Sequence, residues 1–225
     1  LFDGKQKFQE CNNINETVDI SSHFVRELKF GRNEFKISQK YIGYVSCVVW
    51  DSAIVACHYF VRYQSFWKGK KQVLELGAGT GVCSILLGAL GANVVATDLL
   101  EGIKLLEQNI EENWEVIARN GGFVKAEILD WNDPCDKTLS FDVIVMIDVI
   151  YYLKALEGLV RLILRSEALT IICCYEVRDI GEPKIAQERF FEMISPFFSI
   201  CSVADEDLDD VYRSPDIKVL RLVRK

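Results

Sequence analysis

Short apolar runs alternate along the chain with stretches of helical periodicity. Gln72–Leu76 predicts a buried strand, and beyond it apolar positions recur three and four residues apart up to Leu90, as on one face of a helix. Gly91 ends this helix, because glycine readily adopts the left-handed backbone common at helix ends. Repetition of the unit predicts an α/β fold with a mostly parallel sheet and right-handed crossovers.

The same patterns predict the other elements. The further predicted strands are Asn93–Thr97, Phe123–Ile128, Phe141–Ile147, Leu169–Cys174, Phe197–Val203 and Ile217–Leu222. The predicted helices are Trp50–Tyr63, which we expect across the sheet edge, Val82–Leu90, Leu100–Trp114, Tyr152–Leu164 and Ile185–Ile194. The last two strands flank the acidic loop Asp205–Asp210 and predict a C-terminal antiparallel hairpin.

The N-terminal part predicts an accessory element. Val18–Ile37 alternates loosely around a turn near Gly31, which is typical of a β-hairpin. We therefore divide the chain into an N-terminal extension with a hairpin, residues 1–40, and one main domain, residues 41–225. A chain of 225 residues with 50% hydrophobic residues and 4 Pro is large enough for a compact core.

Composition excludes several classes of function. A net charge of −7 opposes binding to a phosphate backbone, so nucleic acid is not an expected partner. Eight Cys without a C-x-x-C pair predict reduced thiols, and with two His they predict no metal site.

Nothing in the sequence predicts a membrane segment. No apolar run reaches the roughly 18 residues that span a bilayer, and Leu1–Lys5 shows no signal-peptide pattern, which favours a cytoplasmic location. Because the sequence starts at Leu1 rather than Met, we expect either a trimmed leader or a start within a longer chain.

Glycines alternate with small residues from Gly77 to Gly81, directly after the first buried strand. Backbone amides without neighbouring side chains approach a ligand closely, so this turn predicts a nucleotide-like cofactor. A dinucleotide turn needs glycine where Val82 stands, and a phosphate-binding loop needs a Gly-Lys-Ser/Thr triplet that is missing. The pattern that remains, starting at Glu75, resembles motif I of class I S-adenosylmethionine methyltransferases. By that resemblance, Glu75 and the turn with Gly77, Ala78 and Gly79 face the methionine end of the cofactor.

Polar and aromatic residues follow the other predicted strands. Ligands of open α/β sheets bind beyond the carboxyl ends of the strands. Asp98 is placed to accept hydrogen bonds from two ribose hydroxyls, and Trp131 to cover the adenine ring. Asp148 and Tyr151 follow the strand expected beside the glycine turn, where a methyl acceptor would lie.

Several segments together resemble the methyltransferase-like 21 family of class I protein-lysine methyltransferases. They are Val49–Asp51, Leu74–Gly81, Asp98, Asp130–Trp131, Asp148–Tyr152, Cys173–Glu176 and Tyr212–Ser214. The resemblance covers Tyr41 to the C-terminus and implies a Rossmann-like, seven-stranded sheet. It implies S-adenosyl-L-methionine as cofactor, contacted by Trp50, Gly77–Gly79, Asp98, Trp131 and the backbone of Ile147, although Ile147 stands where a small residue is expected.

The same resemblance implies a lysine channel. Asp148 and Tyr151 are the predicted catalytic residues, and Tyr152, Tyr175 and Glu176 the predicted channel wall. Aromatic faces attract a sulfonium or ammonium by about 0.5–2 kcal/mol each, and a carboxylate orients the incoming amine. In-line methyl transfer chiefly requires alignment of the reactants, so no dedicated strong base is expected.

The resemblance also implies the partner, a folded protein, with the hexameric AAA ATPase valosin-containing protein as the expected substrate of a monomeric enzyme. Nucleobase-amine methyltransferases usually carry two prolines where Val149 and Ile150 stand here. Two alternatives remain open. One is methylation of another protein or of a small-molecule amine, and the other is a non-catalytic module that docks a basic surface through Asp205–Asp210.

Overall fold

The computed structural model describes residues 23–41, 43–69, 71–133 and 139–225. The strands are β1 His23–Phe30, β2 Asn33–Lys40, β3 Gln72–Leu76, β4 Asn93–Asp98, β5 Phe123–Ile128, β6 Val143–Ile147, β7 Thr170–Glu176, β8 Phe198–Ser202 and β9 Ile217–Arg224. The α-helices are α1 Asp51–Arg62, α2 Gln64–Trp67, α3 Val82–Ala89, α4 Leu100–Glu112, α5 Trp114–Ala118, α6 Leu153–Arg165 and α7 Gly181–Ile194. Two short 3₁₀ helices are η2 Val45–Cys47 and η3 Asp205–Asp207.

The main sheet has seven strands in the order β5-β4-β3-β6-β7-β9-β8. Strands β3 to β7 pair in parallel, whereas β9 is antiparallel to both β7 and β8. This arrangement confirms the predicted mixed sheet and its C-terminal hairpin. The chain builds outward from β3 to β5 and then returns to place β6 on the other side of β3. The carboxyl ends of β3 and β6 therefore flank the point where strand order reverses, the usual position of a ligand in such sheets.

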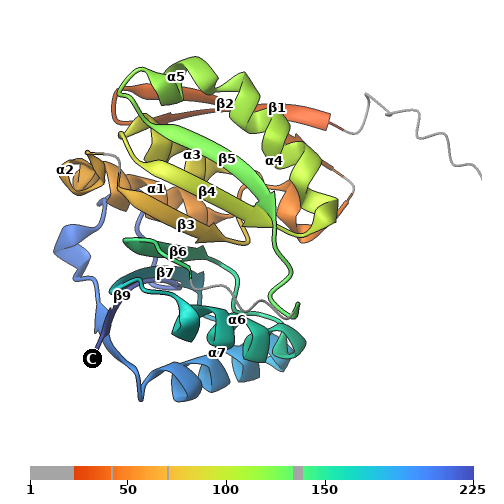
Figure 1. Cartoon of the computed structure of the whole chain (residues 1–225), viewed down its shortest axis with the longest axis vertical. Helices are drawn as coiled ribbons and strands as arrows, with labels where there is room; N and C mark the ends of the chain where they lie inside the picture. Colours follow the sequence, from red (N-terminus) through yellow and green to blue (C-terminus); the bar gives the residue numbers. More distant parts are fainter. Residues whose placement is uncertain (1–22, 42, 70, 134–138) are drawn as a thin grey trace, which may run out of the picture.

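Helices cover both faces of the sheet, as Figure 1 shows. One hydrophobic cluster joins α1, α3 and the β1–β2 hairpin to one face, and a second joins α6 and α7 to the other. Alternate residues of the central strands enter different clusters, since successive strand side chains point to opposite faces. On β6, Val145 belongs to the first cluster and Met146 to the second.

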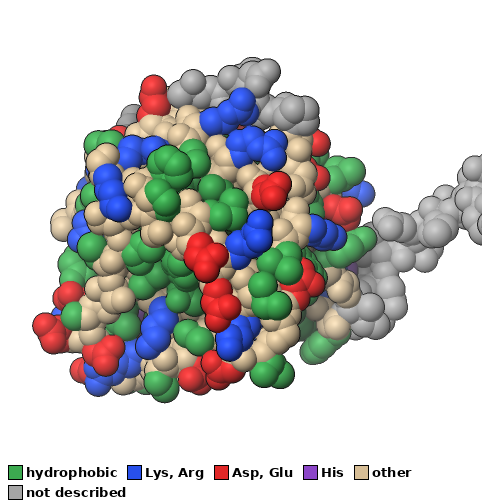
Figure 2. Space-filling view, turned by 90° about the horizontal axis from the view of Figure 1, so that it is seen from below, with side chains coloured by type: hydrophobic (Ala, Val, Ile, Leu, Met, Phe, Trp, Pro, Cys, Tyr) green, Lys and Arg blue, Asp and Glu red, His purple; other side chains and the backbone are tan. Residues whose placement is uncertain are grey.

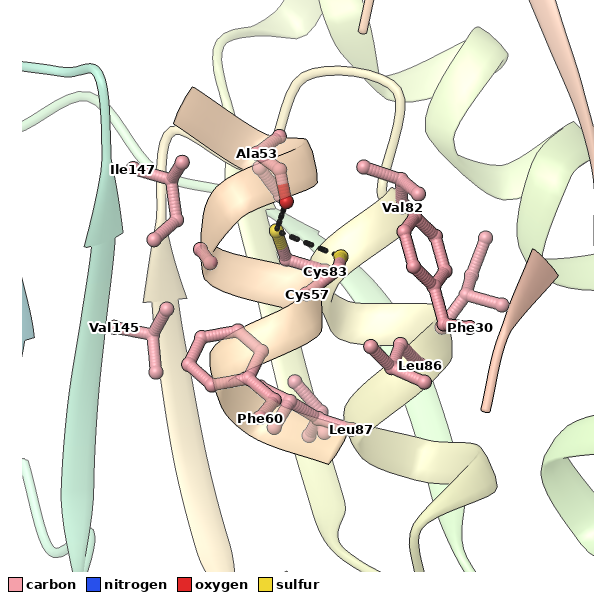
Figure 3. Packing of buried hydrophobic residues seen from close by; sticks show 14 of the residues in the cluster. Phe30, Ala53, Cys57, Phe60, Val82, Cys83, Leu86, Leu87, Val145 and Ile147 are labelled. Atoms are coloured by element: carbon pink, nitrogen blue, oxygen red, sulfur yellow. Dashed lines mark hydrogen bonds between the residues drawn. The ribbon is translucent and has the colours of Figure 1, made fainter. Parts of the chain in front are cut away.

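Helix α1 packs on a face of the sheet and on α3, so its predicted position across the sheet edge is wrong. Figure 3 shows this contact, where Cys57 and Cys83 approach to 3.7 Å between their Sγ atoms and the Cys83 thiol donates to the carbonyl of Ala53 at 3.8 Å. The described cysteines carry free thiols, as predicted for them; they are Cys47, Cys57, Cys83, Cys173, Cys174 and Cys201. Cys11 and Cys135 lie outside the described residues.

Two buried asparagines attach the hairpin to α4. The Asn109 carboxamide accepts from the backbone N–H of Ser38 at 2.8 Å and donates to its carbonyl at 3.0 Å. Asn113 does the same with Lys36, at 3.0 and 2.8 Å. Phe35 also enters the main core cluster, so the hairpin and the domain share one core. The boundary at residue 40 stays a prediction, and Val18–Ser22 of the predicted hairpin lies outside the described residues.

Element boundaries differ from the predictions at two helices. The predicted helix 100–114 breaks at Asn113, whose φ of −105° and ψ of 11° are not helical, and a separate α5 begins at Trp114. The Asn113 side chain donates to the carbonyl of Asn109 at 2.8 Å. Helix α7 starts at Gly181, four residues before the predicted start. Pro183 lies in its first turn, where its missing N–H costs no intrahelical hydrogen bond.

Figure 2 shows the molecule from below the view of Figure 1. On the described part of this face, Lys and Arg side chains are interspersed with Asp and Glu, and hydrophobic side chains lie between them. This face therefore offers no continuous basic surface of the kind that binds a phosphate backbone.

Candidate active site

The glycine turn joins β3 to α3 at the centre of the sheet. Gly77, Gly79 and Gly81 have positive φ angles of 69°, 57° and 82°, which side-chain-bearing residues rarely adopt. A Cβ at Gly77 would lie 2.8 Å from Val149 Cγ1 and 3.5 Å from Trp131 Cζ2. Both the backbone conformation and the neighbouring side chains therefore require glycine at this position.

Glu75 lies beneath the turn and is 2% exposed. Its carboxylate accepts a hydrogen bond from the Ser84 hydroxyl, and its backbone carbonyl accepts one from Thr97 Oγ1 at 2.7 Å. Burial raises the pKa of the Glu75 carboxyl to about 7, although the Ser84 hydrogen bonds oppose the shift. The side chain expected at the methionine end of the cofactor thus binds the first turn of α3, which fixes the helix relative to the turn.

Asp98 ends β4 beside the turn. Its Oδ2 accepts from the Gly79 N–H at 2.7 Å and its Oδ1 from the Leu99 N–H at 2.8 Å. Burial raises the pKa of Asp98, and the two N–H donors oppose that shift. A carboxylate has about four lone-pair sites, so roughly two remain for further donors. A vicinal diol, as in a ribose, matches that pair of acceptors.

Ser46 closes over the turn from η2, a contact that no sequence pattern marks. Its carbonyl lies 3.1 Å from the position of a Cβ at Gly79, and its hydroxyl 3.4 Å from that of a Cβ at Gly102. Trp50 stands at the other end of this segment, where its Nε1 donates to the carbonyl of Val45 at 2.9 Å. Trp50 as a whole residue remains 42% exposed. The segment before α1 therefore contributes backbone and a hydroxyl near the turn.

Trp131 and Ile147 differ in which of their atoms could face a ligand. The Trp131 ring flanks Gly77, as the Cβ distance above indicates, and its carbonyl approaches Gly158 of α6 so closely that a Cβ there would lie 2.4 Å away. Ile147 ends β6 opposite Cys174, and its side chain belongs to the core on the α1 side, visible in Figure 3. Only the backbone of Ile147 is thus left to face a ligand.

Asp148 follows β6 in a strained conformation. Its φ of 55° is the only positive value among the described non-glycine residues. Such strain clusters at functional sites, where the surrounding structure maintains it. Here the Asp148 N–H donates to the Cys174 carbonyl at 2.7 Å, and its carboxylate accepts from Ser52 Oγ at 3.2 Å and the Glu176 N–H at 3.3 Å. Burial raises the pKa of Asp148, and these donors oppose the shift.

Arg178 completes this cluster and was not anticipated from the sequence. Its guanidinium lies 2.7 Å from Glu176 Oε2 and 4.0 Å from Asp148 Oδ2. Asp148 and Glu176, two predicted site residues, are thus brought together by a shared cation and by the Glu176 N–H. The sequence did offer one signal for Arg178, because it lies two positions after Glu176, an acid at the end of a predicted strand.

The predicted channel tyrosines divide between two places. Tyr151 and Tyr152 lie with ring centroids 4.4 Å apart, and Tyr152 is 44% exposed. Burial raises the pKa of Tyr151 to about 12, with smaller contributions from Tyr152, Asp98 and Asp148. Tyr175 instead packs on Phe191 of α7, 5.5 Å between centroids, on the face opposite α1.

Neither a metal site nor a membrane-spanning helix is found among the residues that the structure describes. No group of three or more His, Cys, Asp and Glu side chains there is arranged to hold a metal ion. None of the helices in the described ranges combines the length and apolarity needed to cross a membrane.

The sheet topology, the glycine turn and the strand-end Asp98 define a class I S-adenosylmethionine-dependent methyltransferase. Among solved structures, the chain is similar to the 16S rRNA N2 G1207 methyltransferase RsmC of T. thermophilus in complex with AdoMet and guanosine, with TM-score 0.60 and 16% identity over 90% of this chain and 51% of that one. It is also similar to the magnesium protoporphyrin IX methyltransferase ChlM of Synechocystis PCC 6803 with bound SAM, with TM-score 0.53 and 19% identity over 77% and 79%. S-adenosylmethionine is the cofactor of the chain.

The chain belongs to the lysine methyltransferase family, whose family model matches residues 29–197. EEF1A lysine methyltransferase 3 of Xenopus tropicalis is 30% identical over 88% of this chain and 84% of its own length. Protein N-lysine methyltransferase METTL21A of Xenopus tropicalis is 30% identical over 82% and 83%. These matches confirm the predicted family and a protein-lysine N-methyltransferase activity.

Proposed function

We propose that this enzyme methylates the ε-amine of a lysine in a folded protein, and that Asp148 and Tyr151 form its acceptor site. The observation that carries the proposal is the constrained Asp148, which lies at the reversal of strand order in a left-handed backbone conformation. Ser52, the Glu176 N–H and Arg178 all face its carboxylate. A carboxylate held this way is suited to receive a cationic side chain.

The residues near the turn fit S-adenosylmethionine. The unused acceptor positions of Asp98 would bind the two ribose hydroxyls, and the Trp131 ring beside Gly77 would cover the adenine. Because the turn from Gly77 to Gly79 carries no large side chain, the rest of the cofactor could approach its backbone closely. When bound, the cofactor supplies an electrophilic methyl group on a sulfonium.

The residues of the chain would then orient the acceptor. Lysine arrives as an ammonium, and Asp148 would attract it and fix its direction by hydrogen bonding. The amine attacks only after it loses a proton to water. Tyr151 remains a neutral phenol at physiological pH, since its pKa is about 12, so it would act by position and by its aromatic face rather than as a base. Tyr152, exposed beside it, would extend this wall toward the protein substrate.

Two protein substrates deserve the first assays. The family resemblance points to the AAA ATPase valosin-containing protein, and one relative is named for EEF1A. The full chain is incubated with methyl-labelled cofactor and each protein in turn, and labelled lysines are located by mass spectrometry. We expect label on a lysine of one of them. If no protein lysine is labelled, while calorimetry shows cofactor binding and label accumulates in low-mass amines, the proposal is wrong. A monomeric state and a cytoplasmic location stay predictions.

A further inference from the structure

The guanidinium of Arg178 lies between the two carboxylates of the proposed acceptor site. Its Nη2 is 2.7 Å from Glu176 Oε2 and 4.0 Å from Asp148 Oδ2. The side chains of Arg178 and Glu176 are each 37% exposed, whereas that of Asp148 is 14% exposed. We call these three residues the acceptor cluster. With both carboxylates ionised, the cluster carries one net negative charge before a substrate arrives.

The backbone around Arg178 is held by groups other than its guanidinium. The Gln187 carboxamide of α7 accepts from the Arg178 N–H at 3.2 Å and donates to the Glu176 carbonyl at 2.7 Å. Between these two residues, the Val177 N–H donates to the carbonyl of Asp216 at 2.7 Å. The segment therefore keeps its place without the guanidinium, and what the Arg178 side chain adds to the site is its charge.

The other titratable groups that interact electrostatically with Asp148 are neutral near physiological pH. They are Tyr151, Cys173 and Cys174, and burial raises the pKa of each. From α1, Asp148 is faced by the Ser52 hydroxyl, which does not titrate in this range. The acids next in sequence to Ser52 and Arg178 are Asp51 and Asp179, and both are exposed to solvent.

Charged side chains on the neighbouring helices and on β9 have other contacts. Glu182 of α7 lies at the start of α6, where its carboxylate accepts a backbone N–H at 2.9 Å. The ammonium of Lys154 on α6 lies 5.5 Å from the centre of the Tyr152 ring. Lys218 of β9 is opposite Tyr175, whose ring packs on α7. The charge beside the Asp148 carboxylate is thus governed by the acceptor cluster itself.

A lysine bound at Asp148 meets two opposing requirements. Negative charges attract its ammonium but also hold the proton on it, because an opposite charge favours the ionised form. The nitrogen reacts only after that proton has left, and the ordinary pKa of lysine is already about 10.4. A cation beside the same carboxylates acts in the other direction. Arg178 opposes the raised pKa of Asp148 in this way, and its charge would act likewise on a bound ammonium.

We propose that Arg178 is a positioning residue of the methyl transfer: its guanidinium offsets the charge of Asp148 and Glu176, so that the bound lysine loses its proton closer to neutral pH. This inference rests on the proposed acceptor site. The ammonium gives its proton to water and keeps the electron pair on nitrogen. That pair forms the bond to the methyl carbon, while the bond from carbon to sulfur breaks and leaves its electrons on sulfur.

The pH profile of methylation tests the proposal. The single-turnover rate at saturating substrate is measured with whichever of valosin-containing protein and EEF1A carries the label. Arg178→Met is expected to move the rising limb of the profile up by about one pH unit, which lowers the rate roughly tenfold near pH 7 and leaves it nearly unchanged near pH 10. Arg178→Lys keeps the charge and is expected to retain the wild-type profile. An equal loss at every pH in Arg178→Met would indicate a structural role and overturns the proposal.

A compensating pair of substitutions isolates the effect of charge. Glu176→Gln is expected to move the rising limb down by roughly one pH unit, because it removes an anion beside the bound ammonium. The double variant Arg178→Met, Glu176→Gln then returns the limb close to its wild-type position. Arg119→Met is the control, since Arg119 is an exposed arginine beside Asn120, which binds the far end of α3 from the glycine turn. A shift in Arg119→Met equal to that in Arg178→Met overturns the assignment.

NMR tests the electrostatics without a protein substrate. The carboxyl ¹³C signal of Asp148, assigned with Asp148→Asn, is titrated in wild type, Arg178→Met and Arg178→Lys. Its pKa is expected to rise by about one unit in Arg178→Met and to stay unchanged in Arg178→Lys. An identical titration in wild type and Arg178→Met overturns the inference.

The experiments separate this inference from the proposed function. If the wild type methylates a lysine and the profile of Arg178→Met equals that of wild type, the role of Arg178 is wrong and the acceptor site stands. If the wild type labels no lysine, the proposed function fails and this inference fails with it.

Discussion

The Ser52 hydroxyl donates to Asp148 Oδ2 across 3.2 Å and so connects the first turn of α1 to the end of β6. The residues are 96 positions apart in the sequence, and their contact depends on α1 lying on the sheet face. The same turn of α1 follows the segment that closes over the glycine turn. Ser52 thus ties the predicted acceptor site to the wall of the predicted cofactor site.

Asp148→Asn is expected to lower kcat about 100-fold and to leave cofactor affinity unchanged. Asn tolerates the left-handed backbone and still accepts the Ser52 hydrogen bond, so the loss reflects charge and alignment. Single-turnover methylation and calorimetry provide the two readouts. Ser52→Ala should lower kcat only several-fold, because the Glu176 N–H and Arg178 still face the Asp148 carboxylate. Wild-type kcat in Asp148→Asn would remove this residue from the acceptor site.

Asp98→Asn is expected to weaken S-adenosylmethionine binding roughly tenfold or more, since it replaces a charged acceptor of ribose hydroxyls. Calorimetric titration measures the dissociation constant directly. Asp142→Asn serves as the control, because Asp142 also accepts a backbone N–H, that of Gln72 at 2.8 Å, but at the opposite end of the strands. Equal affinity in the two variants would contradict a cofactor role for Asp98.

Gly77→Ala is expected to abolish measurable cofactor binding and to reduce the free energy of unfolding by about 2 kcal/mol. The added Cβ meets Val149 in a backbone conformation that alanine disfavours. Gly121→Ala is the matched control, because Gly121 has a similar φ of 74° with no atom within 4 Å of the Cβ position. Gly121→Ala should reduce the free energy of unfolding by about 1 kcal/mol and bind the cofactor normally. Denaturant unfolding and calorimetry separate the two effects.

Glu75 predicts a pH dependence of stability. Its folded pKa of about 7 exceeds the ordinary 4.5, so between these values the folded chain keeps a proton that the unfolded chain has lost. The free energy of unfolding therefore falls as pH rises across this range, by up to about 3 kcal/mol. Glu75→Gln lacks this ionisation, so its stability relative to wild type should increase from about pH 5 to about pH 8. Urea unfolding measures this difference in the free energy of unfolding between Glu75→Gln and wild type. An equal difference at both pH values would contradict the assignment.

The sequence predicted the sheet and the residues at its strand ends, because periodicity and glycine spacing are local signals. Asp98 and Asp148 followed from strand ends alone. Ser46 and Ser52 did not, since each reaches the site through packing between elements far apart in the chain. Arg178 was missed although it lies only two residues after Glu176. For Tyr175, in contrast, the sequence predicted a residue of the channel wall, but the ring packs elsewhere. Its position at a strand end was apparent, but the face toward which its ring points depends on the alternation of β7 and on Phe191.

The pairing of Asn109 and Asn113 with β2 has a consequence for self-association. An edge strand with unsatisfied amides is a template for intermolecular β-pairing. Here two carboxamides cap alternate backbone positions of that edge, as a neighbouring strand would. Replacing both asparagines by alanine would leave these backbone groups of β2 unpaired at the edge. We then expect slow oligomerisation through the hairpin before the methyltransferase domain itself unfolds.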